Sequence, residues 1–450
     1  MSEVGEKNQQ VVGDGKKSET KGRKYIVMDI VFYAGSLNYD QGAGNYQALK
    51  KITKWDGKRY TLVSRYALRY SLLKTGEQLG LWTVASGNIL ARAGERDKTV
   101  IQPSIKILLS GEILNYPDYD FFGYLITGTT PQNSREAPVK ISHAVSLTPY
   151  HYDSHFAGNL DMAKRMVEAG KAEKMDPNLF TVEEHQTYYI YTVVIDVDRI
   201  GKNDVYLAKD SKIEIGKDNK MKVSEIEVNA NKLIVKEIDQ KKKKEKKKEE
   251  IEIDNNKIKI EPKPIGEKIL LLEQTTKDDK NNKIRNLIKA ILNLNRDIKA
   301  RKEFLHPKLL ILGLYDGTYQ TFKDRIRLSN AYEERYEEEI DKDGNNKVKV
   351  IKRVVKLQRP VFEISGKIEA KNRHGGGQPP VIDELKKLLE ENKRDKTKSQ
   401  QNEEDHEEDN NDKAQSLEKE IDIDGFLSGN NKTGVWIYRA PEIEVRNSDK

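Results

Sequence analysis

One short apolar run constrains the fold of this chain more than any other feature. Residues 25–33 read YIVMDIVFY and are almost all β-branched, aromatic or otherwise apolar, which is the pattern of a strand buried on both faces of a sheet. The same pattern returns at residues 188–197, YYIYTVVIDV, and at residues 308–315, KLLILGLY. The three segments are far apart in sequence, so we expect them to meet in one central sheet.

Helical patterns follow the first two of these predicted strands. Residues 60–74 read YTLVSRYALRYSLLK, and residues 283–299 carry apolar side chains at helical spacing. In the first helix, we expect Arg65 and Arg69 on the far side from a buried stripe. The side chains of that expected stripe are Val63, Tyr66, Ala67, Tyr70 and Leu73. Tyr66 and Tyr70 are therefore assigned to the core and not to base stacking.

The order of these elements favours the α+β class. A core sheet of about four strands with two helices on one face, as in the ferredoxin-like and RNA-recognition folds, accommodates the order best. Such a sheet needs a further strand between the first helix and the second buried strand. We place it at residues 99–110, TVIQPSIKILLS. A doubly wound parallel sheet is the competing fold, but it requires more regular β-α alternation.

Composition limits the possible functions. The chain has 450 residues, of which 36% are hydrophobic and 34% charged, which predicts one main domain with large insertions. Its formal net charge of +7 permits a polyanionic partner without requiring one. There is no cysteine, so neither a disulfide framework nor a thiolate metal site is possible. We found no signal peptide and no apolar run of about 18 residues, and therefore expect a cytoplasmic protein without a membrane partner.

Charged segments interrupt the predicted core. Residues 1–23 and 386–420 have the composition of disordered segments. Residues 201–280 read as hairpins around a lysine-rich run at residues 241–250, KKKKEKKKEE. A run of this kind is usually solvated and mobile, although on a flexible insertion it could also grip a nucleic-acid backbone.

Two arginines one helical turn apart are the clearest binding signal. Arg65 and Arg69 would present two guanidinium groups from one helix, which suits the repeated phosphates of a nucleic-acid backbone. The alternative is that both side chains face water or pair with acidic residues. The preceding loop, residues 35–44, contains glycines with Ser36 and Asn38 and matches neither a Walker loop nor a dinucleotide fingerprint.

Signals for catalysis are weak. His151 and His155 have a spacing typical of metal ligands, but the proline at position 149 argues against a helix that presents both rings, and there is no HExxH motif. Asp29 and Asp196 lie in predicted strands without a second carboxylate at a fixed spacing. We therefore predict no catalytic residue, no metal ion and no cofactor.

Several of these segments together resemble a known family. They are similar to the backbone subunit of type I CRISPR Cascade complexes, the Cas-seven family, and within it to the DevR-type members of type I-B. The similar segments read YIVMDIVFYAGSLN, LVSRYALRYSLLK, ISHAVSLTPYHYDSHF, YIYTVVIDVDRIG, IRNLIKAILNL and HPKLLILGLYDG. Ser64, Ala67, Leu68 and Arg69 stand where the family helix carries a serine followed by an A-L-R-like step. The resemblance covers much of residues 24–316, and the lysine-rich insertion and the acidic segment near 402–412 depart from it.

The resemblance implies a modified RNA-recognition palm with two large insertions. By position, the palm comprises residues 24–75, 185–200, 281–385 and 421–450. Residues 76–184 would form a fingers-like insertion, and residues 201–280 a thumb-like insertion that holds the lysine-rich run.

The implied function is binding without catalysis. Several copies would stack along one CRISPR RNA (crRNA), together with other Cascade subunits, and hold it for pairing with target DNA in antiviral defence. The side chains expected along the RNA are Ser36, Asn38, Asn45, Lys50, Lys51, Ser64, Arg65, Arg69 and His143. One alternative is a metal-dependent ribonuclease of the related type III backbone kind, with Asp29 or the pair of His151 and His155 at the ion. Another alternative is a solitary RNA-binding module that does not polymerise.

Overall fold

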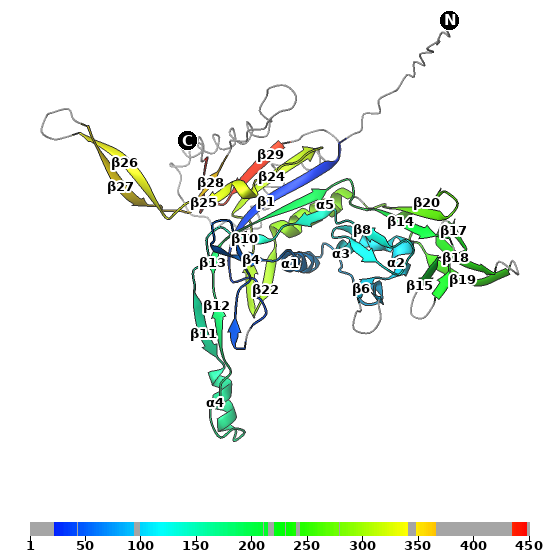
Figure 1. Ribbon diagram of the computed structural model, residues 1–450, viewed down its shortest axis with the longest axis horizontal. Coiled ribbons are helices and arrows are strands. Elements are labelled where there is room, and N and C mark those ends of the chain that lie inside the picture. Colours follow the sequence, from blue (N-terminus) through cyan, green and yellow to red (C-terminus); the bar gives the residue numbers. More distant parts are fainter. Residues whose placement is uncertain are drawn as a thin grey trace, which may run out of the picture.

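A central antiparallel sheet organises the computed structural model of the chain (Figure 1). The structure describes residues 22–42, 44–93, 100–209, 211–214, 220–229, 231–239, 244–278, 280–340, 348–365 and 434–447. The strands of the central sheet lie in the order β29-β24-β1-β13-β10-β4-β3, and β9 also pairs with β13. Their bounds are β1 (Lys24–Gly35), β3 (Lys51–Thr53), β4 (Arg59–Val63), β9 (Val139–Ile141), β10 (Ala144–Ser146), β13 (Gln186–Asp196), β24 (Leu309–Asp316) and β29 (Gly434–Arg439).

The three predicted buried strands form the middle of this sheet. β1 pairs with β13 on one side and with β24 on the other. Alternate residues of β1 enter two different cores, with Ile30 and Phe32 in one and Val27 and Val31 in the other. Because both faces of the sheet are covered, these strands read as nearly continuous apolar runs.

Two helices cover one face of the sheet. The helices α1 (Arg65–Gln78) and α5 (Lys280–Leu292) contact each other and share a core with β1 and β13. Along the chain, the elements follow the order β1, α1, β10, β13, α5, β24. The α+β class predicted from sequence is therefore confirmed.

The prediction of a sheet strand at residues 99–110 is wrong. Instead, β6 (Val100–Pro103) forms a separate hairpin with β5 (Leu90–Ala93), and the rest becomes the short helix α2 (Ile105–Ser110). The hydroxyl of Ser104 caps α2 by accepting a hydrogen bond from the Ile107 N–H group, and Gly111 ends the helix at φ 76°. The place beside β13 is taken by β10, which is only three residues long and has too short a pattern to be recognised in sequence.

The buried side of α1 also differs from the predicted one. Tyr66 and Tyr70 are 66% and 63% exposed. The buried side chains of this helix are Leu68, Ser71, Leu72 and Thr75, together with Gly76. Small and polar residues can line this side because the ring of Trp82 lies directly against Gly76 and Arg296 donates a hydrogen bond to the Ser71 hydroxyl. Hydropathy alone would predict that Ser71, Thr75 and Gly76 are exposed to solvent, which is why the prediction failed.

A second body lies to one side of the central sheet (Figure 1). Its core joins residues 105–126 to residues 205–272, two segments that are far apart in sequence. It contains α2, η3 (Glu112–Asn115), α3 (Pro117–Asp120), β7 (Tyr124–Ile126), β8 (Asn133–Arg135), β14 (Lys202–Ala208), β15 (Lys212–Glu214), β16 (Lys220–Lys222), β17 (Glu225–Asn229), β18 (Lys232–Asp239), β19 (Lys244–Glu252), β20 (Ile258–Ile265) and β21 (Ile269–Thr276).

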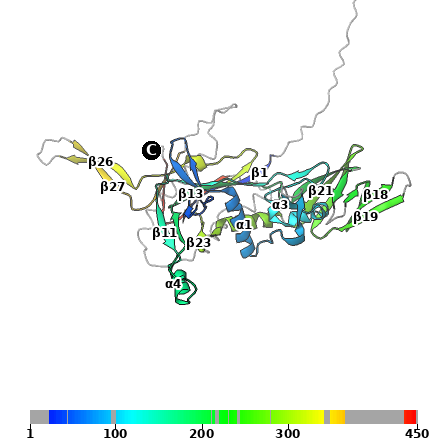
Figure 2. The same cartoon turned by 60° about the horizontal axis from the view of Figure 1, so that its bottom comes forward.

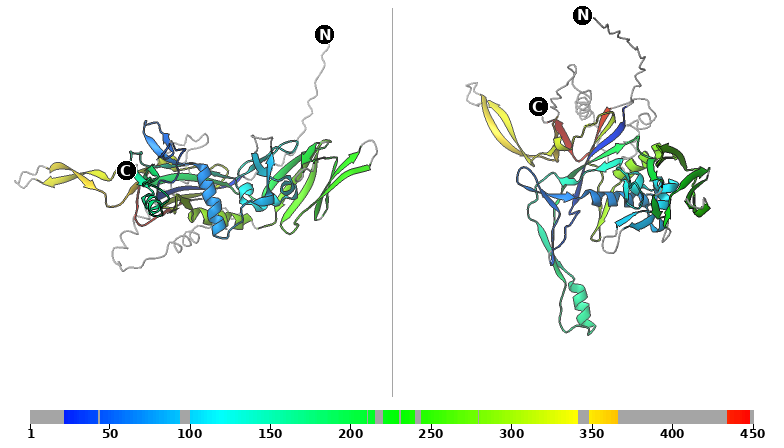
Figure 3. Two further views of the ribbon diagram at one scale, coloured as in Figure 1. Left: turned by 90° about the horizontal axis from the view of Figure 1, so that it is seen from below. Right: turned by 45° about the vertical axis from the view of Figure 1, so that its right-hand side comes forward.

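A long arm projects from the opposite region of the molecule (Figure 1; Figure 3, right). It consists of β11 (Ser154–Gly158), β12 (Leu179–Glu183) and the helix α4 (Leu160–Glu168) at its end, and β2 (Tyr46–Gln47) pairs with β12 near its base. The segment 76–184, which the sequence presents as one insertion, thus contributes both to this arm and to the second body.

The remaining strands follow α5. A hairpin of β22 (Asn295–Ile298) and β23 (Arg301–Phe304) contacts β1 and α1. The far face of the central sheet packs against Phe322, Ile443 and the apolar side chains of β25 (Ile326–Leu328), β28 (Val361–Ile364) and β30 (Glu444–Asn447). The short helix η4 (Lys323–Arg325) lies between Phe322 and β25. A second hairpin, β26 (Tyr332–Ile340) and β27 (Val348–Lys356), projects outward (Figure 1).

The lysine-rich run is more ordered than predicted. Residues 244–250 belong to β19, which pairs with β18, so the expectation of a mobile segment is wrong for these residues; residues 241–243 lie outside the described part. Lys246 pairs with Glu237 at 3.0 Å and Lys248 with Glu250 at 2.6 Å. These pairs give two lysines of the run acidic partners.

Two other predictions cannot be compared with the structure. Of the segments expected to be disordered, residues 386–420 and all of residues 1–23 except 22 and 23 lie outside the described residues. Among the helices that are described, none has the length and apolar character needed to cross a bilayer.

Asp29 stabilises the contact between the central sheet and the segment that packs on its far face. Its side chain is fully buried, one oxygen accepts a hydrogen bond from the Thr192 hydroxyl, and the other accepts one from the Phe322 N–H group at 2.6 Å. We expect Asp29→Ala to lower the free energy of unfolding by about 1–3 kcal/mol, because a buried N–H donor would lose its acceptor. Chemical denaturation would measure this change, and a loss no larger than that of Asp29→Asn, which keeps an acceptor, would contradict it.

The same carboxyl should make stability depend on pH. Burial raises the pKa of Asp29 in the folded protein, so its contribution to stability is present below the unfolded pKa of about 3.9 and is lost as the pH rises through the folded pKa. The free energy of unfolding of the wild type should therefore fall relative to that of Asp29→Asn as the pH rises above about 4.

Candidate nucleic-acid interface

The first residues of α1 are held by polar side chains from three segments. The hydroxyl of Ser64 caps the helix by accepting a hydrogen bond from the Ala67 N–H group at 3.2 Å. The Asn38 side-chain oxygen accepts one from the Ser64 N–H group, and His143 Nδ1 accepts one from the Arg65 N–H group, each at 2.9 Å. The loop after β1, the start of α1 and the residues before β10 therefore meet at Arg65.

Arg65 itself points to solvent together with Tyr66. Its guanidinium group donates a hydrogen bond to the Tyr66 hydroxyl at 3.0 Å and lies 5.0 Å from the centre of the tyrosine ring. Among the described residues, we find no carboxylate that forms an ion pair with Arg65. An exposed cation beside an exposed ring can contact a phosphate and stack on a base of the same strand.

His143 is suited to its role as an acceptor at this site. Burial lowers its pKa, and the nearby positive charges of Arg65 and Lys323 lower it further. The imidazole is therefore neutral at physiological pH, which leaves Nδ1 free to accept the hydrogen bond from the Arg65 N–H group. The Arg65 backbone is thus fixed while its side chain remains exposed.

Arg69 has a different environment from Arg65. It donates a hydrogen bond to the main-chain oxygen of Asp118 at 3.0 Å and lies over the ring of Phe122, 4.7 Å from its centre. Burial lowers the pKa of its guanidinium group. The two arginines therefore face different neighbours, and Arg69 attaches α1 to the second body.

The other residues expected along the RNA differ in whether their side chains already have partners within the protein. Ser36 is buried, with φ 49°, and its hydroxyl bonds to Glu184 and accepts a hydrogen bond from the His185 N–H group. Lys51 pairs with the buried Glu183, while Lys50 lies 3.6 Å from Asp40. Asn45 is exposed beside β12. The structure thus brings together Asn38, Ser64, Arg65 and His143, and gives Ser36 and Lys51 internal partners.

Sequence reasoning missed three contributors to this surface. Tyr66 and Tyr70 are exposed on successive turns of α1, and the signal for this was the row of small residues at positions 71, 75 and 76, which marks the packed side of the helix. Lys323 lies close enough to His143 to lower its pKa. No sequence signal could have linked Lys323 to His143, because the two residues are far apart in the chain.

The residues considered for a metal-dependent reaction are not gathered into one site. Both oxygens of Asp29 are engaged inside the sheet. His155 lies on the arm, 3.3 Å from Glu184, and His151 is exposed. Within the described ranges, no three histidine, aspartate or glutamate side chains are grouped so that they could hold a metal ion.

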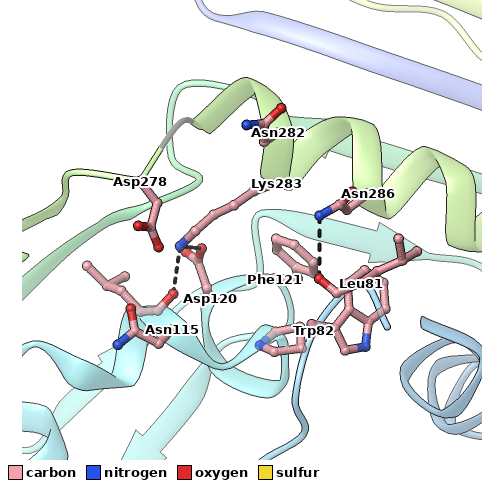
Figure 4. A pocket seen from close by; sticks show the side chains of 11 residues that line it. Leu81, Trp82, Asn115, Asp120, Phe121, Asp278, Asn282, Lys283 and Asn286 are labelled. Atoms are coloured by element: carbon pink, nitrogen blue, oxygen red, sulfur yellow. Dashed lines mark hydrogen bonds and ion pairs between the residues drawn. The ribbon is translucent and has the colours of Figure 1, made fainter. Parts of the chain in front are cut away.

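A cavity of about 340 Å³ lies between α3, α5 and residues 81–82 (Figure 4). Lys283 crosses it, donating to the Leu114 main-chain oxygen at 2.7 Å and pairing with Asp120 at 3.1 Å. Asn286 donates a hydrogen bond to the Leu81 main-chain oxygen. These polar groups satisfy one another, so we regard the cavity as a joint between the central sheet and the second body.

Comparison with known proteins identifies one matching family. Residues 26–336 match the family model described as "CRISPR-associated negative auto-regulator DevR/Csa2". No curated protein sequence matches the chain.

Solved structures similar to this chain include subunits of CRISPR complexes. A chain of "CRISPR RNA-guided surveillance complex, pre-nicking" is 10% identical with a TM-score of 0.35, over 67% of this chain and 81% of that one. A chain of "CRISPR RNA-guided surveillance complex" is 10% identical with a TM-score of 0.31, over 80% of this chain and 98% of that one. A chain of "Type IV-B CRISPR Complex" is 16% identical with a TM-score of 0.23, over 38% of this chain and 73% of that one.

Proposed function

Because the chain belongs to the CRISPR-associated DevR/Csa2 family, we propose that it is a non-catalytic subunit that binds crRNA. In this proposal, several copies lie along one guide RNA in a type I-B Cascade complex in the cytoplasm. They hold the guide so that its bases can pair with target DNA, and other Cascade subunits complete the assembly.

The topology of the central sheet supports a palm of the RNA-recognition type. The four strands β24-β1-β13-β10 are neighbours in that order, α1 lies between β1 and β10 in the chain, and α5 lies between β13 and β24. This is the arrangement of two split βαβ units with both helices on one face. We assign the fingers-like and thumb-like roles to the insertions at residues 76–184 and 201–280, as the family resemblance implies.

The observation that carries the proposal is the exposed Arg65 and Tyr66 pair. Its backbone is held by Asn38, Ser64 and His143, so the charge and the ring are presented from a rigid helix end. Contacts with phosphates and stacking on a base face carry little sequence information. This suits a protein whose bound guide varies in sequence while base pairing supplies the specificity.

Replacement of Arg65 tests the proposal. We expect Arg65→Ala to weaken binding of single-stranded RNA about tenfold at moderate salt, irrespective of sequence, because one charged contact with a phosphate is lost. The slope of log K against log salt should become shallower by about 0.7, the value for one phosphate contact on a single strand. Fluorescence anisotropy of labelled RNA over a salt series would measure both quantities.

Two further variants complete this experiment. Arg359→Ala removes an exposed arginine whose guanidinium bonds to the main-chain oxygen of Pro441 on the far side of the sheet, so its RNA binding should equal that of the wild type. Arg69→Ala should lower stability more than it lowers the salt slope, because Arg69 already bonds to Asp118. Equal affinity and equal slope for Arg65→Ala and Arg359→Ala would refute the assigned role of Arg65.

The arm supports the part of the proposal that concerns neighbouring copies. No residue of α4 is buried, and Met162 and Met166, 55% and 46% exposed, lie one turn apart on the same side of the helix. Phe156 on β11 is also exposed. An apolar helix side at the end of a projecting arm is costly to leave in water, and we propose that it packs against an adjacent copy of the chain.

A further inference from the structure

A second exposed aromatic side chain lies at the edge of the central sheet. Trp55 is in the turn between β3 and β4 and is 96% exposed. Figure 2 and Figure 3 show this hairpin, in blue, projecting from the sheet. A single exposed apolar residue needs no explanation by itself, so the surroundings of Trp55 decide its meaning.

The turn that presents Trp55 is well built. The Lys54 N–H group donates to the Lys58 main-chain oxygen at 3.1 Å, and the Gly57 N–H group donates to the Lys54 main-chain oxygen at 3.0 Å. Gly57 has φ 73°, a conformation that favours glycine. Asp56 accepts hydrogen bonds from the Lys58 N–H group and the Tyr60 hydroxyl. The indole ring is therefore held outward by a defined turn.

Basic residues predominate around Trp55. Residues 50–59 contain five basic residues, Lys50, Lys51, Lys54, Lys58 and Arg59, and one acidic residue, Asp56. Lys50 and Lys51 already have acidic partners outside the hairpin, which leaves Lys54, Lys58 and Arg59 beside the turn. The carboxylate of Asp56 is already engaged within the turn. Arg59, the first residue of β4, and Lys58, which precedes it, are both exposed. A ring flanked by exposed cations is the arrangement that binds an unpaired base together with its phosphates.

The strand β4 connects this hairpin to Arg65. β4 runs from Arg59 directly into the start of α1, a path of about 20 Å at 3.3 Å per residue. One nucleic-acid strand could therefore follow β4 and contact both aromatic sites.

We infer that the hairpin of β3 and β4 is a second contact for the single strand that passes Arg65. An unstacked base lies on the indole ring of Trp55, and Lys58 and Arg59 contact the neighbouring phosphates. This inference rests on the proposed function and names its ligand more closely: an RNA strand with at least one base out of the helical stack.

Tryptophan emission of the full chain tests the inference directly. The chain has three tryptophans, and Trp82 is held by a hydrogen bond from its ring N–H group to the Leu73 main-chain oxygen. Addition of a mixed-sequence single-stranded RNA of about 12 nucleotides should quench the emission of the wild type, and Trp55→Phe should lose that quenching. Trp55→Ala should bind the RNA about 5- to 100-fold more weakly, and Trp55→Phe should retain most of the affinity, because a phenyl ring still stacks.

The charged residues give an independent measurement. The double variant Lys58→Ala with Arg59→Ala should reduce the salt slope by about 1.4, or two phosphate contacts on a single strand. Tyr332→Ala removes an exposed ring on β26 and should leave quenching, affinity and slope unchanged. All of these side chains are exposed, so melting temperatures close to that of the wild type are expected.

The outcomes separate this inference from the proposed function. Absence of RNA binding by the wild type would overturn the proposed function and the inference with it. Normal RNA binding that falls in Arg65→Ala but remains unchanged in Trp55→Ala, without quenching, would overturn the hairpin contact alone. Loss of self-association in Trp55→Ala at unchanged RNA affinity would also overturn it, because the occupant would then be a second copy of the protein.

Discussion

Replacing Asp120 with alanine should lower the free energy of unfolding by about 3–5 kcal/mol, since it leaves a buried guanidinium group without its carboxylate. Asp120 and Arg135 are both buried, and their side chains pair at 2.9 Å. The other Asp120 oxygen pairs with Lys283 of α5, while the Gly201 N–H group donates to the first. Urea denaturation of the purified full chain would measure the change.

Asp118 provides the matched control for this prediction. It lies two residues away on the same short helix, is only partly buried, and its carboxylate accepts a hydrogen bond from the Ala85 N–H group. Asp118→Ala should cost about 1 kcal/mol, the value of one ordinary hydrogen bond. A similar cost for both substitutions would show that the Asp120 network does not hold the second body to the sheet. A double-mutant cycle with Arg135 would give the coupling energy between the two side chains.

The Asp120 network also bears on function. It joins α3 and β8 of the second body to α5 and to the turn that follows β13, and Arg69 of α1 bonds to the main chain of Asp118 beside it. The position of the second body relative to the start of α1 therefore depends on a few buried polar contacts. Loss of these contacts should reduce RNA binding by displacing α1, without removing any group that contacts the RNA.

Introducing charge on the arm should abolish assembly along RNA. In Met162→Asp with Met166→Asp, two carboxylates replace the apolar side of α4, and burying them against a neighbouring copy would be strongly unfavourable. We expect binding of a short RNA to equal that of the wild type. On a long RNA, the molecular mass measured by light scattering should fall from that of a multi-copy assembly to that of independently bound copies.

A substitution on the opposite side of the same helix controls for effects on α4 itself. Lys164 and Glu168 face each other one turn apart at 3.7 Å, and both are exposed. Lys164→Ala with Glu168→Ala should leave assembly unchanged, because exposed pairs of this kind contribute little. If the Met162 and Met166 double variant assembled on long RNA as the wild type does, the arm would not be the contact between copies.

Much of the central sheet could be predicted from local patterns. The runs at residues 25–33, 188–197 and 308–315 are apolar because both faces of the sheet are covered, and each became a central strand. The spacing at residues 283–299 indicated α5, although that helix ends at Leu292 and residues 295–298 form β22. The pattern at residues 60–74 located α1 but not its buried side. β10 was missed because three residues contain too little pattern to distinguish a strand from a loop.

The candidate site was only partly predictable. Arg65, Ser64, Asn38 and His143 were chosen from residue type and position, and the structure brings them into contact. The pairing of Arg65 with Arg69 as one phosphate site did not anticipate the Asp118 main-chain oxygen and the Phe122 ring, which come from the second body. Trp55 and Lys323 gained their significance only from their neighbours in space.

The amino-acid sequence by itself determined the three long central strands and the approximate positions of the two helices that cover them. It also determined that the chain has the residue types of a phosphate-binding protein without cysteine chemistry. The tertiary structure decided which side of α1 is buried, which arginine remains exposed, and that two lysines of the lysine-rich run pair with glutamates of the same small sheet. The physical reason is that periodicity reports burial within one element, whereas the partner of each charged group is set by contacts between segments that are distant in the chain.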